Sequence, residues 1–328
     1  MKCIVLALAA LLALPAHAAE IRIGTVKLVT AGSLFIAQEK GYFAAEGLDA
    51  KFIWFDAPGP VIQALVAGDI DIGTTGSSAA IYALGGQGAI KIVAAQAHEE
   101  PGFRINAFAV SNRAFDGGLK TYRDLAGHTI GVAQVGGPTH YAAALVLEKY
   151  GIDIKSVRFL PLQSNPNVQS AVSGGTADTG VLPAIGVVPA VEHGAFKVLG
   201  WIGDETPWQS SAVIAATATT NQKPDLIRHF LAAYRKAGRE YHDAFAAPDG
   251  TRRDGPTAPE ILAIFAKYTG QSEAQLRLGL AYVDPEARID FADVRRQIAW
   301  FKAQNMLKPE VQADQILDPR FAVPLPAN

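Results

Sequence analysis

Two short segments rich in Gly, Ser and Thr each stand directly before a predicted helix: Thr74 to Ser78 and Gly136 to His140. Free backbone N–H groups at the start of a helix, together with the positive end of the helix dipole, form a ready anion site. Ser77, Ser78 and Thr139 can add hydroxyl donors. Simple N-capping uses the same residue types and can coexist with ligand contact. The two segments therefore predict a pocket for an anionic group.

Further candidate ligand-binding residues follow the other predicted strands. The full candidate set is Thr30, Gly32, Ser33, Gly59, Gly76, Ser77, Ser78, Gln134, Gly137, Thr139, His140, Asn165, Pro183 and Trp208. In open α/β sheets, ligands bind outside the carboxyl ends of the parallel strands, and this rule selects most of the set. His140 is included for its position, because a lone histidine is usually a surface or structural group.

Aromatic and charged residues near these segments leave the chemistry of the ligand open. Candidate walls for an apolar part of the ligand are Trp54, Phe55, Phe103, Tyr141 and Trp208, although most large aromatic residues simply belong to the core. Arg104 would pair with a carboxylate or sulfonate, or it is a surface arginine. Asp56 would instead favour a cationic or hydroxylated ligand. The sequence does not decide between these two.

Enzyme motifs are absent from the sequence. It contains no G-x-S-x-G elbow, no G-x-x-x-x-G-K-[ST] loop and no H-E-x-x-H pair. His98, Glu99 and Glu100 are the nearest approach to a metal cluster, but adjacent ligands without a further partner are weak evidence for a metal. We therefore expect no catalytic residues, no metal and no cofactor.

The composition is that of an ordinary globular protein. The 328 residues include 29 Lys and Arg against 31 Asp and Glu, for a net charge of −2, with 49% hydrophobic and 18% charged residues. This balance excludes wholesale disorder and gives no electrostatic footprint for nucleic acid. At this length, two lobes are the better expectation than one compact domain.

The first 18 residues are typical of a signal peptide. Lys2 gives the positive start, Ile4 to Leu14 form a short apolar run, and Ala16 and Ala18 place a cleavage site after Ala18. The run is too short for a membrane span, which needs about 20 residues, and a buried N-terminal helix is the alternative. The only cysteine, Cys3, precedes the run. We expect an exported, periplasmic monomer that is not embedded in a membrane and has no disulfides.

The elements that must position the candidate site alternate as β-α-β-α-β, which predicts a mostly parallel sheet flanked by helices. Strands are expected at about 21–24, 50–55 and 70–73, and helices at about 34–46 and 61–67. A shift of 107 positions superposes Ile23 on Ile130, Phe52 on Phe159 and, among other pairs, Asp71 on Asp178 and Gly73 on Gly180. The chain is therefore expected to contain two equivalent halves.

Strands that connect the halves define the predicted domains. A crossover strand near 108–112 and a return strand at 212–216 divide the chain into lobe one, 19–108 and 213–328, and lobe two, 109–212. Apolar stripes at helical spacing follow the return strand, first from Pro224 to Tyr241. These C-terminal helices are expected to pack on lobe one, with a partner-binding face as the minority alternative.

Four stretches resemble the solute-binding proteins of ABC importers, specifically the nitrate/sulfonate/taurine-type group, which includes thiamine-precursor-binding relatives. The stretches are AQEKGYFAAEGL at 37–48, ALVAGDIDIG at 64–73, DLAGHTIGV at 124–132 and LEKYGI at 147–152. The resemblance implies an α/β, two-lobed periplasmic-binding-protein fold of type II, with a mixed, mostly parallel sheet in each lobe. It also implies a small solute bound in the cleft between the lobes and delivery of that solute to ABC permease subunits.

The resemblance does not identify the solute. A small organic anion, a sulfonate or carboxylate that includes aromatic ones, is the first expectation. The alternatives are a thiamine-precursor-like heterocycle, a solute sensor that docks on a signalling receptor, or an enzyme on the same fold.

Overall fold

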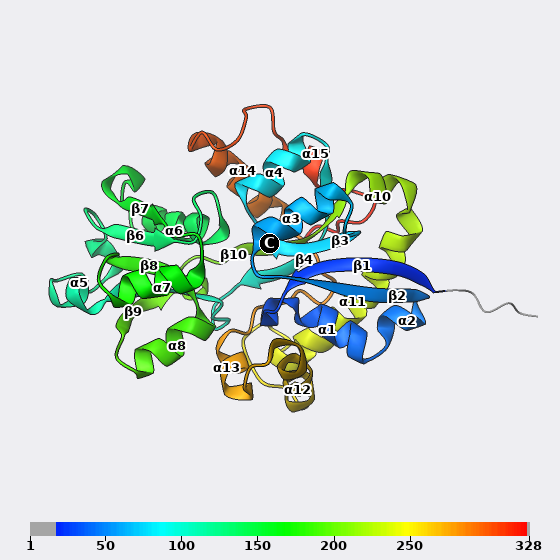
Figure 1. Ribbon diagram of the computed structural model, residues 1–328, viewed down its shortest axis with the longest axis horizontal. Helices are drawn as coiled ribbons and strands as arrows, with labels where there is room; N and C mark the ends of the chain where they lie inside the picture. Colours follow the sequence, from blue (N-terminus) through cyan, green and yellow to red (C-terminus); the bar gives the residue numbers. More distant parts are fainter. Residues whose placement is uncertain (1–17, 327–328) are drawn as a thin grey trace, which may run out of the picture.

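The computed structural model describes residues 18–326, so nearly all of the predicted signal peptide lies outside the described residues. Two five-stranded sheets lie side by side, each flanked by helices (Figure 1). This is the two-lobed α/β architecture expected from the sequence, and we call the part built on the first sheet lobe one and the other lobe two. No helix of residues 18–326 has the length and apolar character needed to cross a membrane.

The first sheet has the order β2-β1-β3-β10-β4. Its strands are β1 Ala19–Val26, β2 Leu48–Phe55, β3 Ile72–Gly76, β4 Ile90–Glu99 and β10 Trp208–Ala216. β1 pairs in parallel with β2 and β3, whereas β10 runs antiparallel to β3 and β4. The sheet is therefore mixed, and the strand from late in the chain lies in its interior.

The second sheet repeats the first with the order β7-β6-β8-β5-β9. Its strands are β5 Asn106–Ser111, β6 Thr129–Val132, β7 Arg158–Pro161, β8 Thr179–Pro183 and β9 Phe196–Trp201. Ile23 pairs with Phe52 in the first sheet and Ile130 with Phe159 in the second, which preserves the shift of 107 positions in the register itself. The repeat predicted from the sequence is confirmed.

A carboxylate holds the same place in both halves. Asp71 accepts a hydrogen bond from the Arg22 backbone N–H at 2.9 Å, and Asp178 accepts one from the Thr129 backbone N–H at 2.9 Å. Both carboxylates precede the third strand of their half, where they tie it to the first. The aspartates and glycines that match under the shift of 107 positions thus lie at the starts of equivalent strands.

Helices cover both faces of the two sheets (Figure 1). On lobe one they are α1 Gly32–Glu39, α2 Tyr42–Ala45, α3 Pro58–Ala67, α4 Ala79–Gly86, α10 Thr217–Gln222, α11 Pro224–Phe245, α12 Ala258–Thr269, α13 Glu273–Leu278, α14 Phe291–Ala303 and α15 Ala313–Ile316. On lobe two they are α5 Asn112–Asp116, α6 Pro138–Lys149, α7 Asn165–Ser173, α8 Ala184–Glu192 and α9 Ile202–Glu205. Short 3₁₀ turns lie at Val29–Ala31, Tyr122–Asp124 and Ile154–Ser156.

The C-terminal helical region packs on lobe one, as expected. The apolar stripe of α11, including Phe230, Tyr234 and Tyr241, is fully buried in the core cluster that contains the α1 side chain of Phe35. The single helix expected at 34–46 is instead two, α1 and α2. Gly41 separates them because its φ of 68° belongs to the left-handed region.

One apolar cluster continues from one lobe into the other. It joins Trp208 and Phe301 of lobe one to Phe108 and Tyr141 of lobe two, all 0–2% exposed. The Tyr141 ring lies 5.4 Å from the Trp208 ring and 5.7 Å from the Phe301 ring between centroids. The lobes are thus packed together on the side of α6 and α14.

The chain passes between the lobes at 100–105 and at 206–207. Gly203, beside the second crossing, lies against the first, because a Cβ there would meet the Glu100 carbonyl oxygen at 2.7 Å and that of Phe103 at 3.1 Å. We propose that the two crossings form one hinge, and the division into lobes along the chain is part of that proposal.

Candidate functional site

The carboxyl ends of the parallel strands point toward the junction of the lobes. β1 is followed by the turn that contains Thr30 and by α1 with Gly32 and Ser33, and β3 ends at Gly76 before α4. In lobe two, β6 leads to α6 and β8 ends at Pro183 before α8. The topology therefore directs the segments selected from the sequence to the same region.

The two Gly/Ser/Thr-rich segments touch each other. The Ala79 N–H at the start of α4 donates to the Gly136 carbonyl at 2.9 Å. A Cβ on Gly76 would lie 2.5 Å from Cγ of Pro138, and one on Gly136 would lie 3.4 Å from Cβ of Ala79. The segments thus face each other across the lobe junction, in direct contact.

Most amides of these segments already have a protein partner. The Ser77 N–H donates to the Ser210 carbonyl at 2.9 Å, and the Gly137 N–H donates to the Gln134 carbonyl at 3.1 Å. The Gly136 N–H donates to Nδ1 of His140 at 3.0 Å. In this arrangement, these three amides hold the loops of their own lobes rather than face an open space, which departs from the expected pair of free helix starts.

His140 has the environment of a structural histidine. Its ring is 3% exposed, packs edge-on against Phe159 at 4.3 Å and lies 5.2 Å from Trp300 between centroids. Burial lowers the pKa of the His140 imidazole to about 4, so the ring is neutral near pH 7 and Nδ1 can accept the Gly136 N–H. Its contacts connect lobe two to α14 of lobe one.

The other candidates fall into buried and exposed groups. Ser77, Ser78, Ser33, Gly32 and Trp208 are buried; Thr30, Gly59, Gly76, Thr139 and Pro183 are half-buried; Gln134 and Asn165 are exposed. Gly32 is enclosed by the rings of Phe265 and Tyr241, where a Cβ would come within 2.7 Å of each. Of the other aromatic candidates, Phe103 and Tyr141 are buried, Phe55 is half-buried and Trp54 is 37% exposed. Asp56 is exposed just after β2.

Three buried polar atoms at the carboxyl edge of the first sheet lack a hydrogen-bond partner within residues 18–326. They are Ser33 Oγ, Gln96 Oε1 and Ser211 Oγ. Gln96 uses its Nε2 to donate to the Thr30 carbonyl at 3.2 Å, and Ser211 pairs with Gly76 at the end of β3. Buried polar groups are normally satisfied, so this edge has unused capacity for a solute or for water.

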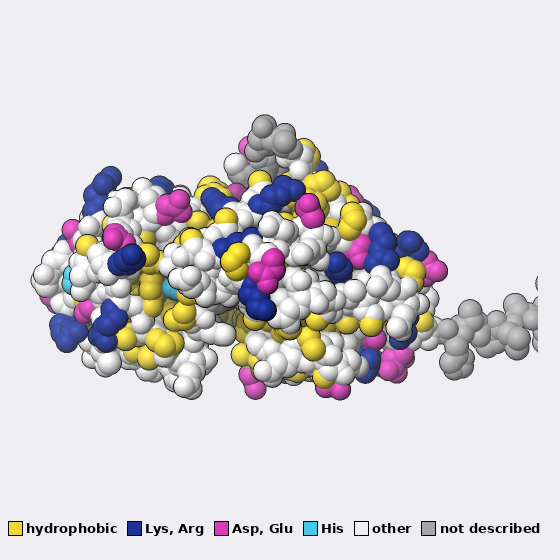
Figure 2. All heavy atoms as spheres, turned by 90° about the horizontal axis from the view of Figure 1, so that it is seen from above, with side chains coloured by type: hydrophobic (Ala, Val, Ile, Leu, Met, Phe, Trp, Pro, Cys, Tyr) yellow, Lys and Arg dark blue, Asp and Glu magenta, His cyan; other side chains and the backbone are white. Residues whose placement is uncertain are grey.

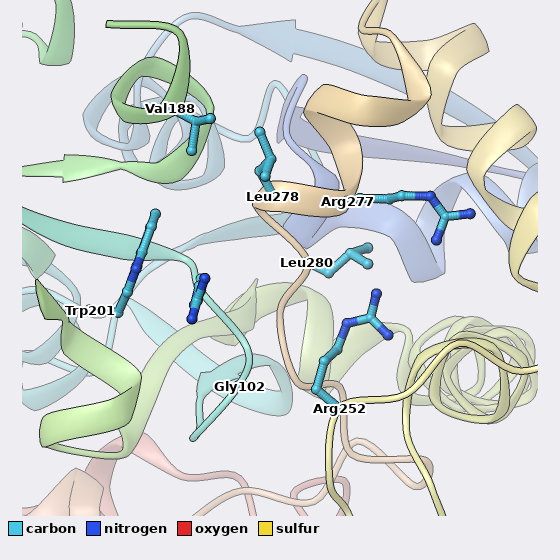
Figure 3. Close-up of a pocket in the computed structure, with 8 residues that line it drawn as sticks. Gly102, Val188, Trp201, Arg252, Arg277, Leu278 and Leu280 are labelled. Carbon is cyan, nitrogen blue, oxygen red and sulfur yellow. The ribbon is translucent and has the colours of Figure 1, made fainter. Parts of the chain in front are cut away.

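A cavity of about 440 Å³ lies between the lobes on the side of α8 and α13 (Figure 3). It is lined by Gly102, Arg104, Val188, Trp201, Arg252, Arg277, Leu278 and Leu280. Figure 3 shows Trp201 on one side, Leu280 and Arg252 on the other, and Val188 facing Leu278 above them. The turn that carries Val29 adjoins this wall, since a Cβ on Gly279 would lie 3.6 Å from Val29.

The three arginines of the cavity differ in how far their charge is neutralised. Arg252 pairs with Asp254 at 2.5 Å, and Arg277 pairs with the same carboxylate and with Glu273. Arg104 has only a 4.0 Å contact with Asp204, and its guanidinium lies 5.3 Å from the Trp201 ring. Arg104 is therefore the cation of this cavity with the weakest counter-charge.

Burial acts on the second arginine of the wall. The Arg252 side chain is 21% exposed, and desolvation lowers the pKa of its guanidinium from the usual value. An anion in the cavity would offset that cost, whereas Arg277 extends away from Trp201 toward its carboxylate partners (Figure 3). The cavity thus combines one weakly paired cation, one partly desolvated cation and four apolar side chains.

Sequence reasoning weighed Arg104 as an anion partner against a surface arginine, and it did not select Trp201, Arg252 or Leu280. These three belong to the end of β9 and to connections between C-terminal helices, which the strand-end rule does not select. A signal was nonetheless present in Arg252 and Arg253, two adjacent cations in a Pro/Asp/Gly-rich turn. Within the described residues, no group of three or more His, Cys, Asp or Glu side chains is arranged to hold a metal ion.

Surface charge elsewhere is dispersed. Figure 2 shows Lys and Arg side chains scattered over the visible face, interspersed with Asp and Glu, rather than gathered in one patch.

Comparison with known proteins gives one family and a consistent fold. The family model described as "NMT1/THI5 like" matches residues 30–251. A putative binding protein of Brucella abortus is 29% identical over 208 residues, which make up 62% of this chain. The match spans 60% of the length of that curated relative.

Several solved structures share the fold at low sequence identity. The periplasmic aliphatic sulphonate binding protein of Escherichia coli has a TM-score of 0.72 at 19% identity, covering 94% of each chain. The periplasmic nitrate-binding protein of Synechocystis has 0.69 at 15%, covering 91% of this chain and 86% of that one. A desulfurization enzyme, DSZB, has 0.64 at 16%, covering 92% and 97%. At these identities the likeness concerns the fold.

Proposed function

Since the chain belongs to the NMT1/THI5-like family, we propose that it binds a small organic anion, a sulfonate or carboxylate with an apolar body, between its two lobes. The observation that carries the proposal is the Arg104 guanidinium beside Trp201 in the inter-lobe cavity, with little counter-charge of its own. A charged hydrogen bond to this group would hold the anionic head, and apolar side chains would enclose the rest.

Both lobes contribute to the cavity, which fits a protein that closes on its ligand. Trp201 and Val188 come from lobe two, whereas Leu280 and Arg252 come from lobe one. Exported proteins of this architecture whose names state a ligand include binders of sulphonate and nitrate. We infer that the chain acts in the periplasm and delivers its solute to the permease subunits of an ABC importer.

A thiamine-precursor-like heterocycle is the second candidate, because the matching family model is described by NMT1 and THI5 and because Trp201 offers a face for stacking. An enzyme is the third class, given the fold of DSZB. A cysteine nucleophile is not available after residue 3, where the only cysteine stands.

Calorimetry with alkanesulfonates, aromatic carboxylates, nitrate and pyrimidines tests the ligand class. Arg104→Gln should weaken the binding of an anionic ligand by about tenfold or more, because a hydrogen bond to a charged group contributes roughly 1.5–3 kcal/mol. Arg158→Gln, which removes an exposed cation on β7 of lobe two, is the matched control and should leave the affinity unchanged.

A different result would indicate that the anionic head group binds at the Gly/Ser/Thr-rich segments. If Thr139→Asp abolished binding while Arg104→Gln had no effect, the proposed cavity would be wrong. Tight binding of an uncharged pyrimidine with no response to any sulfonate or carboxylate would favour the second candidate.

A further inference from the structure

A second and larger cavity, of about 980 Å³, opens on lobe one and has no part in the proposed solute site. It is lined by His98, Glu100, Pro101, Asp249, Gly250, Thr251, Tyr282, Asp284, Arg288, Asp290, Phe291, Ala292, Arg295, Pro324, Leu325 and Pro326. Its wall carries four carboxylates and two guanidinium groups, so its chemistry is opposite to that of the first cavity.

The two cavities lie back to back on three shared chain segments. His98, Glu100 and Pro101 line the second cavity and Gly102 and Arg104 the first, so the first crossing between the lobes separates them. The same division occurs between Thr251 and Arg252 and between Tyr282 and Leu280. A ligand in the second cavity would therefore touch the segments that also form the solute site.

Within the described residues, Glu100 is the carboxylate of this wall with neither an ion pair nor a side-chain hydrogen bond. Asp284 is neutralised by a bidentate pairing with Arg288 at 2.8–3.1 Å, Asp249 accepts from the Thr251 hydroxyl at 2.7 Å, and Asp290 caps α14. Glu100 has no ion pair with any residue in 18–326. It therefore lies partly buried in an acidic surrounding.

The position of Glu100 is unfavourable for a negative charge, and its pKa reflects this. Burial, followed by repulsion from Asp290 and Asp293, raises the pKa of the Glu100 carboxyl to about 7. The two arginines do not relieve it, since Arg288 is committed to Asp284 and Arg295 reaches toward Asp314 at 3.8 Å. A cation bound beside Glu100 would reduce this repulsion.

His98 supplies an independent sign of a missing partner. The side chain is 2% exposed, lines the cavity, and its Nε2 has no hydrogen-bond partner within residues 18–326. Burial lowers the pKa of this imidazole, so the ring is neutral and one of its two nitrogens carries a lone pair. Nε2 is the ring nitrogen left with unused hydrogen-bonding capacity, in a residue that lines the cavity.

We propose that the second cavity binds a primary ammonium ion, with the Glu100 carboxylate and His98 Nε2 as acceptors of its N–H groups. An ammonium group has three donors and no acceptor, which matches a wall whose free groups are acceptors. The alkyl part of the ligand would lie against Tyr282, Phe291 and Leu325. The ligand class is a small alkylamine, a cation distinct from the anionic solute of the first cavity.

Titration calorimetry of the exported chain with n-butylammonium chloride, above the pKa of Glu100, tests the proposal. We expect saturable binding that Glu100→Gln weakens by about tenfold or more, since it removes the charge but keeps the shape. Glu310→Gln removes an equal charge from an exposed position outside the cavity and should leave binding unchanged. Tetramethylammonium, which has no N–H donor, should bind more weakly than n-butylammonium.

A second readout follows the histidine directly. The ¹⁵N resonance of His98 Nε2 should shift when n-butylammonium is added to the wild type, and potassium chloride should not reproduce the shift. Absence of saturable binding, or equal affinity in wild type and Glu100→Gln with an unmoved His98 resonance, would overturn the proposal. Neither outcome bears on the anion site, because the probe has no anionic group and Arg104 is unchanged.

Discussion

Glu99 is a fully buried carboxylate at the end of β4, where the chain leaves lobe one. Its Oε1 accepts from Nδ2 of Asn106 at 2.5 Å, and the Asn106 backbone N–H lies 3.4 Å from Oε2. Burial raises the pKa of the Glu99 carboxyl to about 7, although these hydrogen bonds and Trp208 oppose the shift. The group therefore holds a proton in the folded protein at pH values where the unfolded chain has lost it.

This proton makes part of the stability pH-dependent. The folded state binds the proton more tightly, so the stability that Glu99 provides is present below about pH 4.5 and is lost as pH rises toward about 7. Glu99→Gln should remove this slope, which is at most about 1.4 kcal/mol per pH unit. Denaturant unfolding of both proteins across this range measures it, and parallel curves for the two proteins would contradict the assignment.

Single residues show how far sequence reasoning reaches. The position of Arg104 near a predicted crossing between lobes made it a candidate, but the sequence left open whether it binds an anion or lies on the surface. His140 was selected for its position after β6. The fold shows that its Nδ1 already accepts from Gly136 and that its ring packs against Phe159 and Trp300. Whether a polar group is already satisfied depends on long-range neighbours, which composition and local spacing do not encode.

At the scale of elements, the contact between the starts of α4 and α6 is sensitive to one methyl group. Gly76→Ala would place its Cβ 2.5 Å from the Pro138 ring, which has little freedom to move. We expect a loss of about 1–3 kcal/mol in the free energy of unfolding, as for other overpacked contacts. Thermal and denaturant unfolding measure the loss.

Gly59→Ala is the matched control for this change. No atom lies within 4 Å of the new Cβ, and the residue is in the first turn of α3. The substitution should be neutral or should stabilise by up to about 1 kcal/mol. Equal melting temperatures for the two variants would contradict the prediction, because they would mean that the starts of α4 and α6 can move apart without loss of stability.

Elements in the first half of the chain were the most predictable part of the fold. Alternating strands and helices, with glycines at element ends, identified β1, β2, α3 and the equivalent elements of lobe two, and the repeat linked Ile23 to Ile130. The connection after α13 was not predictable as a cavity wall. Leu280 contributes through tertiary packing alone, without a motif of its own.

For the whole molecule, the proposed function requires motion at the hinge. Opening is expected on the side of α8 and α13, because Tyr141, Trp208 and Phe301 already pack the lobes together on the other side. Small-angle scattering should therefore show a modest decrease in the radius of gyration of the protein when an anion that binds is added. A Gly203→Val variant, which would crowd the Glu100 carbonyl, should shift the free protein toward a different opening.

Identical scattering profiles with and without a ligand proven to bind by calorimetry would contradict closure. They would mean instead that the solute enters a cleft whose shape is already fixed. An unchanged profile for Gly203→Val, with wild-type affinity, would count against the hinge at the two crossings.

The interior position of β10 also sets an order on the growing chain. The first sheet needs Trp208–Ala216 between β3 and β4, so no nascent chain that ends before residue 208 can complete it. All five strands of the second sheet lie between Asn106 and Trp201 and are available earlier. As the polypeptide emerges from its N-terminus onward on the far side of the membrane, the second sheet can be completed first, while the N-terminal strands wait for β10.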